Sequence, residues 1–250
     1  MMRTSNPTLN NVTFSSMGRA AYAEEAMTIQ GTVNKSLALL VLLLLSASWT
    51  WKSFLIDHNP QAVTPWLLIG GIGGLIFALI TVFKKAWSPV TAPVYALLEG
   101  LVLGGISSIF EAQYPGIVIE AMGLTFGTLF CLLFAFKSGV IRATEKFKLG
   151  VVAATGAIGL FYLITMVLGF FNVRIPYIHE NGLIGIGFSL FVVVIAALNL
   201  VLDFDFIEQG AAQGAPKFME WYGAFSLMVT LIWLYLEILR LLSKMRSRRD

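Results

Sequence analysis

The chain has 250 residues, of which 57% are hydrophobic and only 12% charged, and its mean hydropathy is +0.80. This composition excludes a water-soluble domain, which would need many more charged residues to cover its surface. The net charge of +3 does not indicate nucleic-acid binding, because the basic residues flank apolar segments and form no stripe with interleaved aromatics.

The polar and apolar segments divide the chain into three parts. Residues 1–34 are polar and are expected to form an N-terminal arm, partly disordered. No small-residue cleavage site follows the first apolar run, so we expect no signal peptide. Residues 35–243 are expected to form one transmembrane bundle, and residues 244–250 a basic tail.

Seven apolar windows are long enough to cross about 30 Å of hydrocarbon as helices. They are residues 37–56, 66–83, 94–110, 117–136, 149–171, 183–203 and 221–242. A β-barrel is excluded because the windows lack sustained alternation and are about twice as long as a tilted strand needs. The expected fold is therefore an all-α, multi-pass membrane bundle.

Glycines recur three and four residues apart in the second and third windows. This spacing lets neighbouring helices approach closely, and no Lys-Ser or Lys-Thr pair follows to suggest a phosphate loop. We therefore expect packing seams at Gly70, Gly71, Gly73, Gly74, Gly100, Gly104 and Gly105.

The loop charges predict the orientation of the bundle. Most Lys and Arg residues fall on the side of the N-terminus, which is therefore expected to be cytoplasmic. Seven full crossings would, however, place the basic tail on the opposite side, against the same rule. Either the tail is tolerated there, or the sixth or seventh helix is re-entrant.

Four acidic residues interrupt the apolar windows or their ends: Glu99, Asp203, Asp205 and Glu237. An ionisable group within a membrane helix costs about 2.5–3.5 kcal/mol on insertion scales, so each of them requires a reason. Glu99 lies six residues into the third window, and Glu237 lies deep in the seventh.

Asp203 and Asp205 are two residues apart, so a helix turns them to nearly opposite faces. Asn199 lies four residues before Asp203 and shares its face, which favours Asp203 as the inward group. Asp205 shares a face with Glu208, nearer the polar linker, and is expected to be wetter.

A polar stripe runs along the seventh window through Ser226, Thr230, Trp233 and Glu237. If it meets Asp203, two carboxylates would share one proton in a site of low dielectric, which would make a proton-sensitive switch. The alternative is that these acids contact headgroup water or pair with Lys84, Lys85 or Arg240.

Metal-site chemistry is not indicated. His58 and His179 lie in loops with no Cys or second His beside them, so we expect solvated histidines and no metal site. Cys131 is the single cysteine, which excludes an intrachain disulfide.

Four strings carry a resemblance to a known family: MTIQGTVNKS, APVYALLEGLVLGGIS, LNLVLDFDFIEQG and APKFMEWYGAFSLMVTLIWLYLEILRLLS. Through them the chain resembles the transmembrane Bax inhibitor motif family, also called Bax inhibitor-1-like, in its bacterial branch. The match spans most of the chain.

The resemblance implies a central last helix wrapped by the other six, a pH-sensing acid pair on the sixth and seventh helices, and a calcium leak. By position, Asp203 matches the sixth-helix aspartate and Glu237 the seventh-helix acid, which is usually aspartate. A basic residue of the second helix can latch the family pair. Residues 66–83 contain none, and only Lys84 and Lys85 at their end could substitute.

The leading hypothesis is a pH-sensitive cation leak with Asp203 and Glu237 as the sensing pair. Glu99, Asp205, Asn199 and Thr230 would support the ion path, calcium would be the transported ion, and no cofactor is expected. The bilayer and cations are the expected partners, and the bacterial inner membrane the expected location.

An alternative hypothesis is a membrane interaction protein that modulates a membrane protease or a stress response through its N-terminal arm. An intramembrane aspartyl protease is disfavoured because it needs two aspartates, and Glu237 is an awkward replacement. We therefore expect no enzymatic activity.

Overall fold

The computed structural model of the chain describes residues 26–57, 60–171 and 182–248. These residues form seven long helices and the short 3-10 helix η1 (Lys85–Trp87). The long helices are α2 (Ile29–Asp57), α3 (Pro60–Phe83), α4 (Ser88–Gln113), α5 (Ile117–Lys137), α6 (Glu145–Phe170), α7 (Leu183–Ala212) and α8 (Met219–Ser247). All seven are long and apolar enough to cross a membrane, which confirms the predicted fold class.

The helices extend beyond the predicted windows. α2 begins at Ile29, within the segment assigned to the polar arm, and α7 continues nine residues beyond Asp203 to Ala212. α8 continues to Ser247, so Lys244 belongs to the helix and is buried, whereas it was expected in the tail. Residues 1–25, His58, His179 and Arg249 lie outside the described residues.

Side chains at the helix ends explain where several helices begin. Thr28 precedes α2, and its hydroxyl accepts a hydrogen bond from Gly31 N, while Thr144 does the same for Phe147 N at the start of α6. The Glu111 carboxylate accepts hydrogen bonds from Gly116 N and Val118 N at the start of α5. These bonds satisfy backbone N–H groups that a helix N-terminus leaves without an internal partner.

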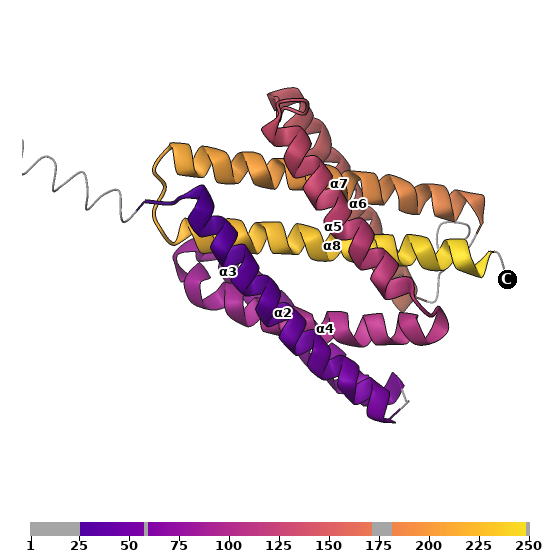
Figure 1. The fold of residues 1–250 in the computed structure, drawn as a ribbon. Coiled ribbons are helices and arrows are strands. Elements are labelled where there is room, and N and C mark those ends of the chain that lie inside the picture. The colour runs from indigo at the N-terminus through magenta and orange to yellow at the C-terminus, as the bar shows by residue number, and fades with distance from the viewer. Residues whose placement is uncertain (1–25, 58–59, 172–181, 249–250) are drawn as a thin grey trace, which may run out of the picture.

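α8 occupies the centre of the bundle, as Figure 1 shows, and is the most buried of the seven helices. α2, α4, α5 and α7 pack along it, whereas α3 packs on α2 and α4. On α4, Tyr95 packs edge-on against Phe225 at 5.0 Å, and Ser107 hydrogen-bonds the Tyr235 hydroxyl at 2.6 Å. The central position implied for the last helix is therefore confirmed.

The glycine seams are also confirmed. A Cβ added at Gly104 would lie 2.2 Å from the carbonyl oxygen of Ala47 in α2, and one at Gly70 would lie 2.5 Å from that of Leu98 in α4. Gly71 faces open space, so it is not part of a seam. The backbones thus meet where a side chain would hold them apart.

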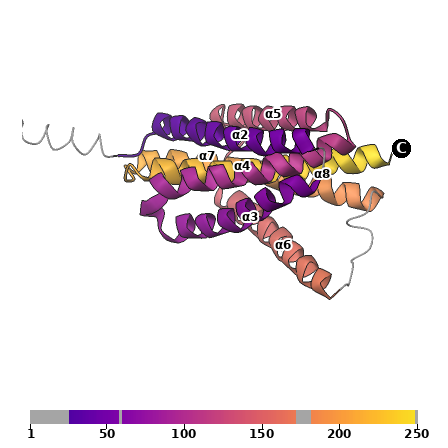
Figure 2. The ribbon, with the colours of Figure 1, turned by 90° about the horizontal axis from the view of Figure 1, so that it is seen from below.

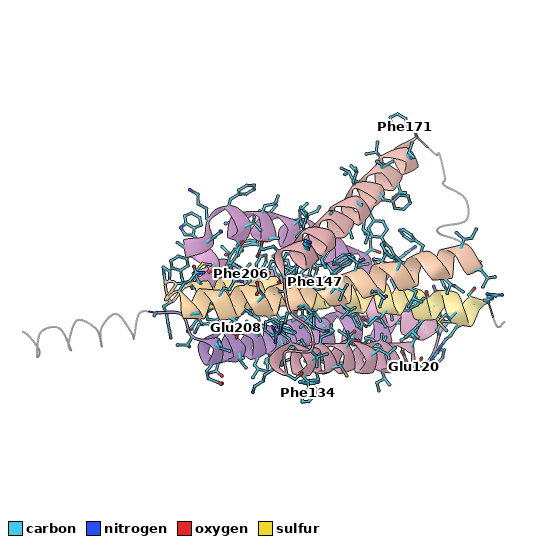
Figure 3. The ribbon with its side chains drawn as sticks, turned by 90° about the horizontal axis from the view of Figure 1, so that it is seen from above. Glu120, Phe134, Phe147, Phe171, Phe206 and Glu208 are labelled. Atoms are coloured by element: carbon cyan, nitrogen blue, oxygen red, sulfur yellow. The ribbon has the colours of Figure 1, made fainter. Side chains whose placement is uncertain are left out.

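α6 departs obliquely from the bundle (Figure 2). In Figure 3, Phe147 near its start lies close to α7, whereas Phe171 just beyond its end stands clear of the other helices. The first half of α6 is held by polar contacts to α7, including an ion pair of Lys148 with Asp205 at 2.8 Å. Its second half presents exposed apolar side chains: Leu160, Leu163, Ile164, Met166 and Val167.

The two ends of the described chain lie at opposite ends of the bundle (Figure 1). We call the end where α2 begins and α7 turns into α8 the N-side, and the opposite end the C-side. α7 and α8 have 30 and 29 residues and run antiparallel over their full lengths, which contradicts the re-entrant alternative. The C-terminal end of α8 therefore lies on the C-side.

Candidate functional site

Asp203 lies in the interior of α7 and faces α8. Ser226 of α8 donates a hydrogen bond to Oδ1 of Asp203 at 2.6 Å, and the aspartate is only 8% exposed. Thr230, one turn farther along α8, is buried beside the same carboxyl group. The predicted inward orientation of Asp203 and of the α8 stripe is therefore what the structure shows.

Glu237 lies on the same stripe but contacts a different helix. Its Oε1 accepts hydrogen bonds from the Tyr162 hydroxyl of α6 at 3.0 Å and from Arg240 Nη1 at 2.8 Å. Arg240 also donates to the Tyr162 oxygen at 3.0 Å and lies over its ring. Glu237 is 2% exposed, so the ion pair predicted as an alternative, with Arg240, forms at a buried carboxylate.

The structure does not bring Asp203 and Glu237 together. Asp203 is opposite Ser226, and Glu237 is eleven residues farther along α8, roughly 16 Å at the usual helical rise. The contact of Lys244 with Ser189, at 2.9 Å, shows that the same antiparallel register continues past Glu237. The expectation that the two acids share one proton by direct contact is therefore wrong for this structure.

Each of the two acids keeps one carboxylate oxygen without a donor. Oδ2 of Asp203 and Oε2 of Glu237 are buried and accept no hydrogen bond of normal geometry from the described residues, although the Thr230 hydroxyl lies close to the Asp203 carboxyl group. A buried polar atom left without a partner costs free energy, so such atoms mark strain or a place where a proton or ion binds.

Glu99 lies apart from both acids, at the interface of α3 and α4. A Cβ added at Gly74 of α3 would lie 2.9 Å from its Oε1, so this glycine makes the room that the carboxylate occupies. On α4, Glu99 lies one turn from Tyr95, which packs on α8. Glu99 is thus a separate intramembrane acid, not part of the α7–α8 seam.

The remaining residues predicted to support the site hold α6 against α7. Asn199 donates to the Thr155 hydroxyl of α6 at 2.7 Å and to its own helix at Ile195 O, not toward Asp203. Asp205 pairs with Lys148 and accepts a hydrogen bond from Gln209. These side chains therefore join two helices, and of the supporting group only Thr230 lies beside Asp203.

A family model described as Bax inhibitor 1 like matches residues 6–247, nearly the whole chain. The chain belongs to the Bax inhibitor 1 like family. A comparison with curated proteins finds no match.

The resemblance to the Bax inhibitor 1 like family implied that a basic residue of the second helix holds the acid pair. The structure shows a different cation at Glu237. In this member the cation at Glu237 is Arg240, three residues away on the same helix. Lys85, one of the two suggested substitutes, instead lies over the Tyr222 ring at 5.3 Å. The seventh-helix acid therefore carries its own counter-ion.

Sequence reasoning missed two buried polar contacts in this Bax inhibitor 1 like chain. Tyr162 was not singled out, although a hydroxyl-bearing ring in an apolar helix is a signal for a buried hydrogen bond. Glu220 was not considered because it sits at the start of α8, yet its side chain is fully buried and pairs with Lys35 and Lys217. Only the tertiary structure brings α2 to that carboxylate.

Proposed function

We propose that this protein is a pH-sensitive cation leak in which Asp203 and Glu237 act as two separate proton-dependent sites. The proposal rests on one observation: each acid is buried in the seam of the last helix with one oxygen that has no donor. Calcium is the favoured cation, because carboxylate oxygens are the ligands that hard divalent ions prefer.

Protons and cations would compete for these oxygens. A buried carboxylate oxygen that has no donor is stabilised by binding a proton or by binding a cation. In the described residues no group of three or more His, Cys, Asp or Glu side chains could hold a metal ion. A passing cation would therefore meet each carboxylate singly, which favours brief occupancy over tight storage.

Protonation of Glu237 would also change how α6 is held. The Tyr162 hydroxyl and Arg240 meet at Oε1 of Glu237, so this carboxylate joins α6 to α8. α6 runs obliquely away from the bundle (Figure 2), and Phe171 just beyond its end stands clear of the other helices (Figure 3). Neutralising Glu237 would weaken its attraction for Arg240 and loosen this polar contact between α6 and α8.

The charges favour a cytoplasmic N-side, and the resemblance to the bacterial branch is the ground for proposing the bacterial inner membrane. Lys35, Lys84, Lys85, Lys137, Lys148 and Lys217 all belong to loops or helix ends on that side. On the C-side, Lys244 donates to Gly185 O and Ser189, and Arg246 pairs with Glu120. Two of the basic residues that would oppose this orientation, Lys244 and Arg246, thus make contacts within the bundle.

The test is calcium flux in proteoliposomes between about pH 6 and about pH 8. The variants are Asp203→Asn, Glu237→Gln and both together, with Glu208→Gln as the control because Glu208 is an exposed acid on the same helix as Asp203. We expect each single variant to remove part of the pH response and the double variant to remove it all. The control should behave like the wild type.

Two results would contradict the proposal. A wild-type pH profile in the double variant would show that neither acid senses protons. Complete loss of the response in each single variant would show that the acids act as one shared pair, against their separation in the structure.

A further inference from the structure

Residues 26–28 cross the N-side end of the two last helices. Ala26 forms an isolated antiparallel bridge with Pro216, and Met27 N donates to Ala215 O at 2.6 Å. Both partners lie in the linker between α7 and α8, so the chain preceding α2 is fastened to the turn that joins these helices. We call residues 26–28 the strap.

The Met27 side chain fills the space between α7 and α8. It is 2% exposed, and a Cβ added at Gly210 of α7 would lie 2.9 Å from its sulfur. At Gly223 of α8 a Cβ would lie 3.5 Å from its methyl carbon and 3.2 Å from Ile207. Two glycines, one from each helix, thus make room for one flexible apolar side chain.

The strap stands directly above Asp203. Ile207 lies one turn from Asp203 on α7, and Gly223 lies three residues from Ser226 on α8. A water molecule entering the seam from the N-side would therefore meet Met27 first, then Ile207, and then the hydrogen-bonded pair of Asp203 and Ser226. Met27 and Ile207 are apolar, so together they separate the carboxyl group from water at this end.

Glu220 holds the strap in place. Its Oε1 accepts hydrogen bonds from Thr28 N at 2.9 Å and from the Thr28 hydroxyl at 2.8 Å, and its carboxylate pairs with Lys35 and Lys217. The glutamate side chain has no exposed surface. A Cβ added at Gly31 would lie 2.1 Å from its Oε1, so the first turn of α2 carries a glycine where the carboxylate approaches.

We propose that the strap is a cover: Met27 closes the N-side end of the α7–α8 seam, and releasing it gives water access to Asp203. The cover is fastened by Glu220, so any event that draws Thr28 from Glu220 would open it. Control of ion flux by this cover rests on the proposed function, whereas the closure itself does not.

The experiment measures thiol labelling of the full chain in proteoliposomes with a membrane-impermeant methanethiosulfonate reagent. The background is Cys131→Ser with Ile207→Cys, which places a thiol between Met27 and Asp203. The strap variants are Met27→Gly, which empties the seam, and Met27→Leu, which keeps it filled. A separate series carries Val192→Cys in place of Ile207→Cys. Val192 is buried between α6 and α7, so its labelling would report loosening of the whole bundle.

We expect Met27→Gly to raise the labelling rate of Ile207→Cys at least about tenfold and Met27→Leu to leave it within about twofold. Val192→Cys should remain unlabelled throughout. Equal rates for Met27→Gly and Met27→Leu would overturn the proposal, and so would labelling of Val192→Cys in step with Ile207→Cys. The labelling rate does not depend on ion transport. If the wild-type protein conducted no calcium, that result would contradict the proposed function and leave the closure by Met27 unaffected.

Discussion

The hydroxyl of Ser226 lies 2.6 Å from Oδ1 of Asp203, whereas Glu237, on the same stripe of α8, reaches across to Tyr162 of α6. One face of the central helix thus contacts Asp203 through Ser226 and carries Glu237, and the two acids have different surroundings. Asp203 has a neutral hydrogen-bond donor, and Glu237 has a cation and a phenol. The two sites should therefore respond to pH separately.

Replacing Arg240 by Gln should destabilise the bundle. The guanidinium pairs with the buried Glu237 carboxylate, so in the variant this carboxylate keeps the Tyr162 hydroxyl but loses its cation. Because Arg240 is about half exposed, we expect a loss of about 1–3 kcal/mol, less than for a fully buried pair. Reversible unfolding in mixed micelles of increasing denaturing detergent measures it.

Arg240→Lys is the matched control, because it keeps the positive charge. Its stability should stay nearer the wild type than that of Arg240→Gln. Equal losses in the two variants, or no loss in Arg240→Gln, would contradict a counter-ion role for Arg240.

Tyr162→Phe should destabilise the bundle modestly by removing the hydroxyl that joins α6 to Glu237. The expected loss is about 1 kcal/mol, because interhelical hydrogen bonds in membranes are weak on average. Reversible unfolding in mixed micelles of increasing denaturing detergent measures it. Tyr222→Phe is the comparison, since the ring contact with Lys85 survives there, and an equal loss in both variants would count against the Tyr162 bond.

Gly104→Ala should cost about 1–3 kcal/mol, because the added methyl would meet the backbone of α2 at Ala47. Gly71→Ala, on α3 where the methyl meets open space, should be neutral or stabilise the helix by up to about 1 kcal/mol. Detergent-induced unfolding of both variants checks the pair. A neutral Gly104→Ala would show that α2 and α4 are not in this close contact.

Glu220 and Lys35 should be energetically coupled. The carboxylate is fully buried and Lys35 is 22% exposed. Removing Glu220 takes away the ion pair of Lys35, and removing Lys35 leaves the buried carboxylate with Lys217 and Thr28. A double-mutant cycle of Glu220→Gln and Lys35→Met should give a coupling of about 1–3 kcal/mol. Additive effects of the two substitutions on unfolding would mean that this ion pair does not fasten α2 to α8.

The sequence located the intramembrane acids but not their partners. Asp203, Glu99 and Glu237 stand out because each interrupts an apolar run, and helical spacing correctly turned Asp203 and the α8 stripe toward each other. Spacing could not tell how far along α8 the stripe meets Asp203, because that depends on the register of two packed helices. Hence the expected contact between Asp203 and Glu237 does not form.

By itself the sequence determined the number of spans, the glycine seams and the family, since each follows from local composition or from spacing within one helix. Only the tertiary structure decided that Tyr162 meets Glu237, that Glu220 fastens α2, and that Met27 packs against Gly210 and Gly223. These contacts join residues 75, 192 and more than 170 positions apart in the chain. Packing of whole helices creates such neighbours, and no periodicity within one segment encodes them.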